Sequence, residues 1–180
     1  MMNNFGGLIL TMFGIGRSKF APGTLASLIT CLIYFPIFIY KPNFLILIIT
    51  FAVFSIYSIV LIDQMQNKFK KKDPKEIVID EFIGESIPIL YLYVTINITG
   101  AINKNWNDYL GFLSISFLSF FLIFRLFDIL KPFPINLIDK KLKNGFGVVL
   151  DDVLAGIFTT ITYYCGYIIY SIGYYFYYLK

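Results

Sequence analysis

Long apolar stretches separated by short polar ones dominate this chain. A membrane-spanning helix needs about 20 mostly apolar residues, within a range of roughly 17–25. Asn43–Ile62 meets this requirement without a charge, and the shorter runs Leu25–Tyr40 and Tyr109–Phe124 are also uncharged. Val153–Leu179 is longer and rich in aromatic residues. The pattern predicts an all-α, multi-pass membrane protein.

Two further apolar segments are less clear. Gly84–Ile102 is the weakest candidate span, because an acidic residue, a proline and an asparagine interrupt it. Phe5–Ile15 is short enough to lie as a helix in the membrane interface. We therefore expect four to five transmembrane helices, and the length fits one domain over residues 1–180.

Composition agrees with a membrane protein and narrows the chemistry. Hydrophobic residues make up 58% of the chain and charged residues only 14%, with a mean hydropathy of +0.74; soluble proteins average roughly 25% charged residues. The sequence contains no histidine, which excludes mechanisms that need an imidazole base, nucleophile or metal ligand. The net charge of +4 is modest, and without a basic tract interleaved with aromatics we expect no nucleic-acid partner.

The charges are distributed unevenly between the loops. If the apolar runs alternate in direction, 12 of the 15 Lys and Arg residues fall on one side, and only Lys41, Lys104 and Lys180 fall on the other. Cationic loops stay in the cytoplasm, so the first side is predicted to be cytoplasmic. All acidic residues except Asp108 lie on or near that side. This predicts a polar site on the cytoplasmic face, with the lysine run at residues 66–75 touching lipid headgroups.

The first polar motif is GIGRSKFAPGTLASL, at residues 14–28. Thr24 follows a Pro-Gly pair and can cap a helix beginning at Leu25. Backbone N–H groups at such a helix start form a ready anion site. The alternative is a loop whose basic residues serve only membrane topology.

The second motif places Asp80 and Glu81 between the apolar groups IVI and FIG. Neighbouring residues on a helix point ~100° apart, so the pair could bind one metal from a helix end or serve two different partners. Gly84 would leave space beside Asp80 on the same face. The alternative is an interfacial acidic pair neutralised by the preceding lysines.

The third motif, FRLFDILKPFP, carries Arg125, Asp128 and Lys131 at every third position. Pro132 disfavours helix at Lys131, so the helix should end there and leave Lys131 free to move, while Pro134 should keep the following segment extended. Two snorkelling cations are the alternative. Snorkelling does not explain the aspartate, which is costly at this depth.

The fourth motif, NGFGVVLDDVLAG, leads into the last apolar run. We expect a flexible turn at Gly145 and Gly147, followed by the carboxylates of Asp151 and Asp152. Two adjacent carboxylates in an apolar frame repel each other, and one pKa rises unless a cation compensates. Mg²⁺ suits this role because it binds one or two carboxylates together with waters and substrate phosphate.

Taken together, the four motifs resemble the phosphatidylglycerophosphatase A family. The matching pieces are APGTLASL, IVIDEFIG, FRLFDILKPFPI with Asp139 following, and GFGVVLDDVLAG, which together span roughly residues 14–156 in family order. The resemblance implies Mg²⁺-dependent removal of the terminal phosphate of phosphatidylglycerophosphate, giving phosphatidylglycerol, at the cytoplasmic leaflet of the bacterial inner membrane. Ala26 and Asn144 stand where the family usually has glycine, and neither departure removes a charge.

These observations lead to one hypothesis and one rival. In the hypothesis the chain is a membrane-embedded lipid phosphatase. Its partners are its substrate, phosphatidylglycerophosphate, and the surrounding membrane phospholipid. The rival is a non-enzymatic membrane carrier, or a scaffold in a lipid-synthesis complex. The expected metal ligands and general base are Asp80, Glu81, Asp128, Asp151 and Asp152. The expected phosphate-binding residues are Arg125, Lys131, Gly23, Thr24 and Ser27, with Lys131 also catalytic.

Overall fold

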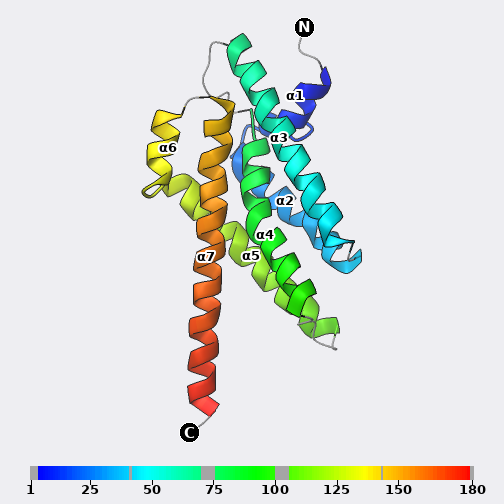
Figure 1. The fold of residues 1–180 in the computed structure, drawn as a ribbon, viewed down its shortest axis with the longest axis vertical. Coiled ribbons are helices and arrows are strands. Elements are labelled where there is room, and N and C mark those ends of the chain that lie inside the picture. The colour runs from blue at the N-terminus through cyan, green and yellow to red at the C-terminus, as the bar shows by residue number, and fades with distance from the viewer. Residues whose placement is uncertain (1–3, 41, 70–75, 100–105, 143, 179–180) are drawn as a thin grey trace.

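The computed structural model describes residues 4–40, 42–69, 76–99, 106–142 and 144–178, and all regular elements in these ranges are helical (Figure 1). In chain order they are α1 (Asn4–Leu10), the 3₁₀ helix η1 (Ile15–Arg17), α2 (Pro22–Tyr40), α3 (Phe44–Phe69), α4 (Ile79–Thr99), α5 (Trp106–Leu130), α6 (Ile135–Lys141) and α7 (Gly145–Tyr178). The lysine run at residues 66–75 lies outside the part of the chain whose side chains are described.

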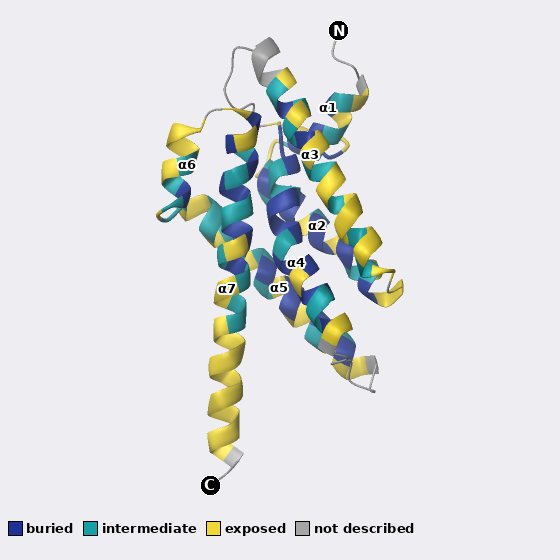
Figure 2. Ribbon diagram, viewed as in Figure 1, coloured by how far each residue is buried: buried dark blue, intermediate teal, exposed yellow. Residues whose placement is uncertain are grey.

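The prediction of an all-α membrane protein is confirmed. Four helices are long and apolar enough to cross a bilayer, namely α2, α3, α5 and α7. The outward faces of α3 and of the second half of α7 are exposed and apolar (Figure 2), as expected of surfaces that meet lipid. The described part of the predicted segment Gly84–Ile102, residues 84–99, is helical and belongs to α4, but α4 is not one of the four.

Helix α4 lies inside the bundle, packed against α2, α5 and α7 (Figure 1). Its buried side chains include Ile89, Leu92 and Tyr93, which share one apolar cluster with residues of α2 and α5. Glu85, which weakens the hydropathy of this segment, is fully buried against Cys31 of α2, whereas Asn97 is exposed and donates to the carbonyl oxygen of Tyr93 in its own helix.

Of two helix ends near the polar motifs, one differs from the sequence prediction and the other agrees with it. Helix α2 begins at Pro22, because proline suits the first helical position, where an N–H would have no partner. Thr24 lies in the first turn of α2, so the prediction that it caps a helix starting at Leu25 is wrong. Helix α5 ends at Leu130, and Lys131 takes a left-handed conformation with φ 41°, in agreement with the predicted end of this helix.

The prediction that the segment after Pro134 is extended is wrong, because this segment forms the short helix α6. Pro134 immediately precedes the first residue of α6, where a missing N–H costs no helical hydrogen bond. The proline starts a helix here instead of preventing one. Helix α6 then packs against α7.

The predicted flexible turn at Gly145 and Gly147 is also wrong, because both glycines lie in the first turn of α7. Two side chains cap that turn. Asn144 Oδ1 accepts a hydrogen bond from the Gly147 N–H at 3.0 Å, and Asp63 Oδ1 from α3 accepts one from the Gly145 N–H. Asparagine is a favoured N-cap residue, so Asn144 supports the helix start.

Helices α4 and α7 approach each other backbone to backbone at Gly84 and Gly156. A Cβ added to Gly84 would lie 2.6 Å from the carbonyl oxygen of Asp152, and one added to Gly156 would collide with the carbonyl oxygen of Gly84. The space that Gly84 leaves is therefore occupied by the backbone of α7. This close crossing brings the two acidic pairs of the sequence together.

Candidate active site

A polar pocket of about 360 Å³ lies at one end of the bundle, where the N-termini of α2, α4 and α7 meet the C-terminus of α5. Pro22 and Gly23 form part of its wall. Six acidic side chains and one lysine line it: Asp80, Glu81, Asp128, Lys131, Asp139, Asp151 and Asp152. The four sequence motifs, far apart in the chain, therefore converge on one pocket.

Three of these carboxylates form a compact cluster. Asp80, Glu81 and Asp152 each offer an oxygen atom, and the three atoms lie within 4.8 Å of one another. Asp152 is only 4% exposed, and Glu81 Oε2 is buried with no hydrogen-bond partner. Buried negative charges this close repel strongly unless a cation compensates. An all-oxygen set of this kind fits Mg²⁺, a hard cation that prefers carboxylate and water ligands.

The start of α2 is pressed against this cluster at Gly23. A Cβ on Gly23 would collide with the carboxylate of Glu81 and would lie 3.2 Å from Nη1 of Arg125. Only glycine fits between the two charged groups without displacing them. The first turn of α2, with its free backbone N–H groups, is thereby placed beside a carboxylate and a guanidinium.

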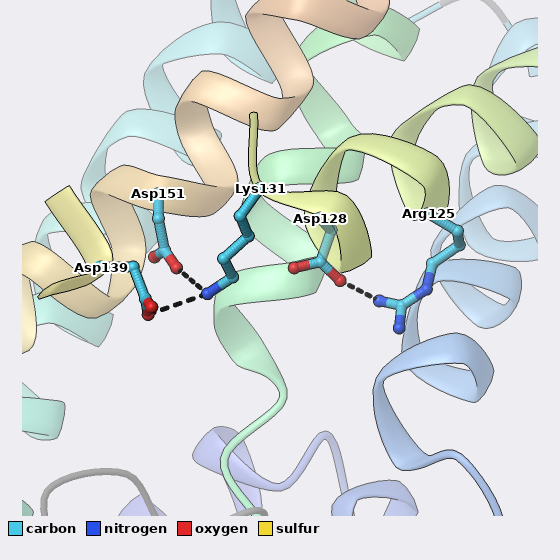
Figure 3. A network of polar contacts seen from close by, with 5 residues as sticks. All are labelled: Arg125, Asp128, Lys131, Asp139 and Asp151. Atoms are coloured by element: carbon cyan, nitrogen blue, oxygen red, sulfur yellow. Dashed lines mark hydrogen bonds and ion pairs between the residues drawn. The ribbon is translucent and has the colours of Figure 1, made fainter. Parts of the chain in front are cut away.

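Arg125 and Asp128 form an ion pair one turn apart on α5 (Figure 3). Their side chains are only 15% and 13% exposed, so the pair is shielded from water. Arg125 Nε is buried and has no hydrogen-bond partner. The guanidinium thus has donor capacity beyond the bond to Asp128.

Lys131 joins two acidic residues from different elements (Figure 3). Its Nζ lies 2.9 Å from Asp139 Oδ1 of α6 and forms a second ion pair with Asp151 Oδ2 of α7. Burial alone lowers the pKa of Lys131, but the hydrogen bonds and charges of Asp151 and Asp139 outweigh it and raise the pKa above its ordinary value. Lys131 therefore keeps its positive charge at neutral pH.

The structure does not place all predicted site residues in the pocket. Thr24 and Ser27 are not among the lining residues. Ser27 is fully buried, and its hydroxyl donates to the carbonyl oxygen of Gly23 at 3.1 Å. Arg125 does not line the pocket either, but it contacts two residues that do, Asp128 by an ion pair and Gly23 by close packing.

Two acidic residues near the site were not predicted as site residues. Asp139 follows the third motif and contacts Lys131 because α6 folds back towards α7. Glu85 lies one turn after Glu81 and is 0% exposed. Its Oε1 accepts a hydrogen bond of 3.5 Å from the thiol of Cys31. A lysine released from a helix end requires acidic partners, and this requirement could have pointed to Asp139.

Comparison with known proteins finds one family model and several relatives. The family model for phosphatidylglycerophosphatase A matches residues 8–167. A Bacteroides thetaiotaomicron protein, provisionally named a phosphatidylinositol-3-phosphatase, is 33% identical over 86% of this chain and 88% of its own length. Proteins named phosphatidylglycerophosphatase A from Haemophilus influenzae and Escherichia coli K12 are 32% and 27% identical, over 86% and 92% of this chain and 83% and 86% of theirs.

No solved structure matches the chain at a significant level. The family match covers most of the chain and includes all the elements that line the acidic pocket. The chain belongs to the phosphatidylglycerophosphatase A family.

Proposed function

We propose that this protein hydrolyses the terminal phosphomonoester of phosphatidylglycerophosphate, giving phosphatidylglycerol and phosphate. The observation that carries the proposal is the pocket itself. It gathers six carboxylates and Lys131 at one end of a membrane bundle, with Arg125 held beside it by Asp128. Such a set is suited to phosphoryl transfer, in which catalysis depends on positioning and on stabilisation of negative charge.

We further propose that the cluster of Asp80, Glu81 and Asp152 holds Mg²⁺. A buried carboxylate oxygen without a partner, in Glu81, and the close approach of the three side chains support this assignment. A bound Mg²⁺ would polarise the phosphoryl oxygens and lower the pKa of a bound water. Asp128 and Asp151 also face the pocket and hold Arg125 and Lys131 in place. The second carboxylate oxygen of Asp151 is buried without a partner, so we propose that it also serves the metal site.

The two cations bind the phosphate beside the metal cluster, since Arg125 lies next to Glu81 at Gly23 and Lys131 is paired with Asp151. Lys131 carries a fixed positive charge and, because its pKa is raised, acts as a charge and not as a proton donor. Arg125 has a free Nε donor, and the first turn of α2 at Gly23 adds backbone N–H groups. Water forms the new P–O bond while a carboxylate of the pocket accepts its proton. The P–O bond to the glycerol oxygen breaks, and this oxygen takes the proton back from the same carboxyl group and leaves as the hydroxyl of phosphatidylglycerol.

The proposed location is the cytoplasmic face of a bacterial inner membrane. The excess of cationic residues in the loops on the side of the pocket supports this orientation. The pocket lies at the helix ends and not at the middle of the spans. A phospholipid could therefore present its headgroup there while its acyl chains stay in the bilayer.

Phosphate release by the purified protein in detergent micelles tests the proposal. The substrates are phosphatidylglycerophosphate and, because of the Bacteroides relative, phosphatidylinositol 3-phosphate at equal surface concentration. We expect release from phosphatidylglycerophosphate at a clearly higher kcat/KM. A preference for the inositol lipid would replace the proposed substrate, and no release from either would favour the rival carrier or scaffold.

A further inference from the structure

A second cavity, of about 450 Å³, lies beside the acidic pocket and has a purely apolar lining. Its walls come from α1, the turn after α1, η1, α2, α3 and α4. Met12 and Ile79 lie deep in it, at 6% and 2% exposure, whereas Phe5 and Phe13 are 66% and 81% exposed and stand at its mouth. We call this cavity the apolar groove. It opens to the exterior of the bundle.

The apolar groove and the acidic pocket share the first turn of α4 as a wall. Ile79 and Phe82 line the groove, whereas Asp80 and Glu81 line the pocket. Residues three apart share a helix face, and the two between them point to the opposite side. A molecule that fills both cavities must therefore be polar at one end and apolar at the other.

The segment that separates the two cavities also carries positive charge. Gly16 of η1 packs so tightly on the backbone at Glu76 that an added Cβ would collide there and would touch Val78 at 3.2 Å. Ile77 lines the pocket on one side of this contact. The exposed Arg17 follows directly. Arg17 lines neither cavity, but it shares η1 with Ile15, which lines the groove, and its positive charge complements the phosphodiester of a phospholipid.

We propose that the apolar groove binds one acyl chain of the phospholipid whose terminal phosphate occupies the acidic pocket. The proposal rests on the proposed function for the identity of the headgroup. It assigns acyl-chain recognition to Ile29 and Ile33 of α2, Phe54 of α3, and Ile79 and Phe82 of α4. Other occupants, such as a second copy of the chain, would not explain why the groove shares a wall with the acidic pocket.

Ile33→Trp tests the proposal, because Ile33 is 46% exposed at the groove and a larger side chain there would fill it without entering the core. Leu32→Trp is the matched control, since Leu32 is the neighbouring residue on α2, is 64% exposed and does not line the groove. KM and kcat are measured for dioleoyl phosphatidylglycerophosphate and for its deacylated headgroup in the same micelles.

We expect Ile33→Trp to raise KM for the diacyl substrate about tenfold, equivalent to losing about two buried methylene groups, while kcat changes little. Its KM for the deacylated headgroup and both constants of Leu32→Trp should change less than about twofold. An equal change for both substrates in Ile33→Trp, or no change for the diacyl substrate, would overturn the assignment.

A binding measurement separates failure of this inference from failure of the proposed function. Phosphatidic acid with a diazirine in one acyl chain is photolysed with the wild-type protein in phosphatidylcholine micelles, and the labelled residues are mapped. Labelling of Ile29, Phe54 or Phe82 that is reduced in Ile33→Trp and retained in Leu32→Trp supports the groove even if no phosphate is released. Labelling confined to other surfaces, or equal in both variants, overturns it.

Discussion

Lys131 shows how a single residue is positioned by its place in the chain. It follows the last residue of α5, takes φ 41°, and its N–H donates to the carbonyl of Phe127 at 2.8 Å. A left-handed residue of this kind commonly terminates a helix. The side chain thereby leaves the axis of α5 and reaches Asp139 and Asp151. Sequence reasoning found its release from the helix but not its two carboxylate partners.

Lys131→Ala should reduce kcat for phosphate release by about 100-fold, because one of the two charges that stabilise the transferred phosphate is lost. Membrane insertion and yield should stay normal. Lys140→Ala is the control, since Lys140 lies on α6 and is exposed. Phosphate release and membrane fractionation are measured for both variants. Normal turnover by Lys131→Ala would show that Lys131 serves only as a structural ion pair.

Asp152→Asn removes one negative charge from the carboxylate cluster without changing its shape. Because the remaining carboxylates then repel less, the variant in chelator should melt at the same temperature as the wild type or higher. Mg²⁺ should raise the melting temperature of the wild type but not of Asp152→Asn, and the variant should release phosphate at least about 100 times more slowly. Equal stabilisation of both proteins by Mg²⁺ would remove Asp152 from the metal site.

At the scale of elements, the crossing of α4 and α7 organises the site. The two helices touch through Gly84 and Gly156, where a Cβ on either would meet the backbone of the other helix. The acidic pairs lie in the first turn of α4 and beyond the first turn of α7, and both line the pocket. Helix packing, and not local sequence, therefore sets the distance between the carboxylates.

Gly156→Ala should separate the two helices and lower the free energy of unfolding by about 1–3 kcal/mol, the usual cost of overpacking. Gly166→Ala is a matched control on the same helix, because an added Cβ there meets nothing within 4 Å and alanine favours helix over glycine. Denaturant-induced unfolding in detergent and phosphate release are compared. Equal stability of the two variants would contradict the proposed role of the crossing.

The elements differ in how far the sequence predicts them. The apolar runs of α2, α3, α5 and α7 are predicted well, since hydropathy directly reflects the lipid environment. Helix α6 is missed because Pro134 is compatible with both an extended segment and a helix start. The cap supplied by Asp63 to Gly145 is also missed, since it joins residues 82 apart in the chain.

The candidate site also has a part that the sequence predicts and a part that it does not. Asp80, Glu81, Asp151 and Asp152 can be picked out because a carboxylate in an apolar frame is costly. Their grouping into one compact cluster and separate ion pairs depends on how four helices pack, which no local pattern encodes. The assignment of Thr24 and Ser27 to phosphate binding rested on a helix start that α2 places elsewhere.

At the scale of the whole molecule, the pocket lies at one end of a long bundle. Helix α7 has 34 residues, about 50 Å at 1.5 Å per residue, whereas the hydrocarbon core of a bilayer is about 30 Å thick. Helix α7 is therefore about 20 Å longer than the core is thick. One end carries the acidic pocket, and the other is an exposed aromatic segment (Figure 2).

Cysteine labelling tests the orientation of the bundle. In a Cys165→Ser background, where the remaining Cys31 is buried, Lys140→Cys marks the pocket end and Tyr177→Cys marks the opposite end. In intact spheroplasts a membrane-impermeant maleimide should label Tyr177→Cys and should reach Lys140→Cys only after lysis. The reverse pattern would place the pocket outside the cytoplasm and contradict the orientation inferred from the loop charges.

The central claim is that the acidic pocket is a metal-dependent phosphatase site, and the metal dependence of phosphate release by the wild-type protein tests it most directly. Purified protein is treated with chelator, supplied with phosphatidylglycerophosphate in micelles, and titrated with Mg²⁺. We expect no phosphate release in chelator and saturable recovery of release as Mg²⁺ is added. Undiminished release in chelator, or no release at any Mg²⁺ concentration, would contradict it.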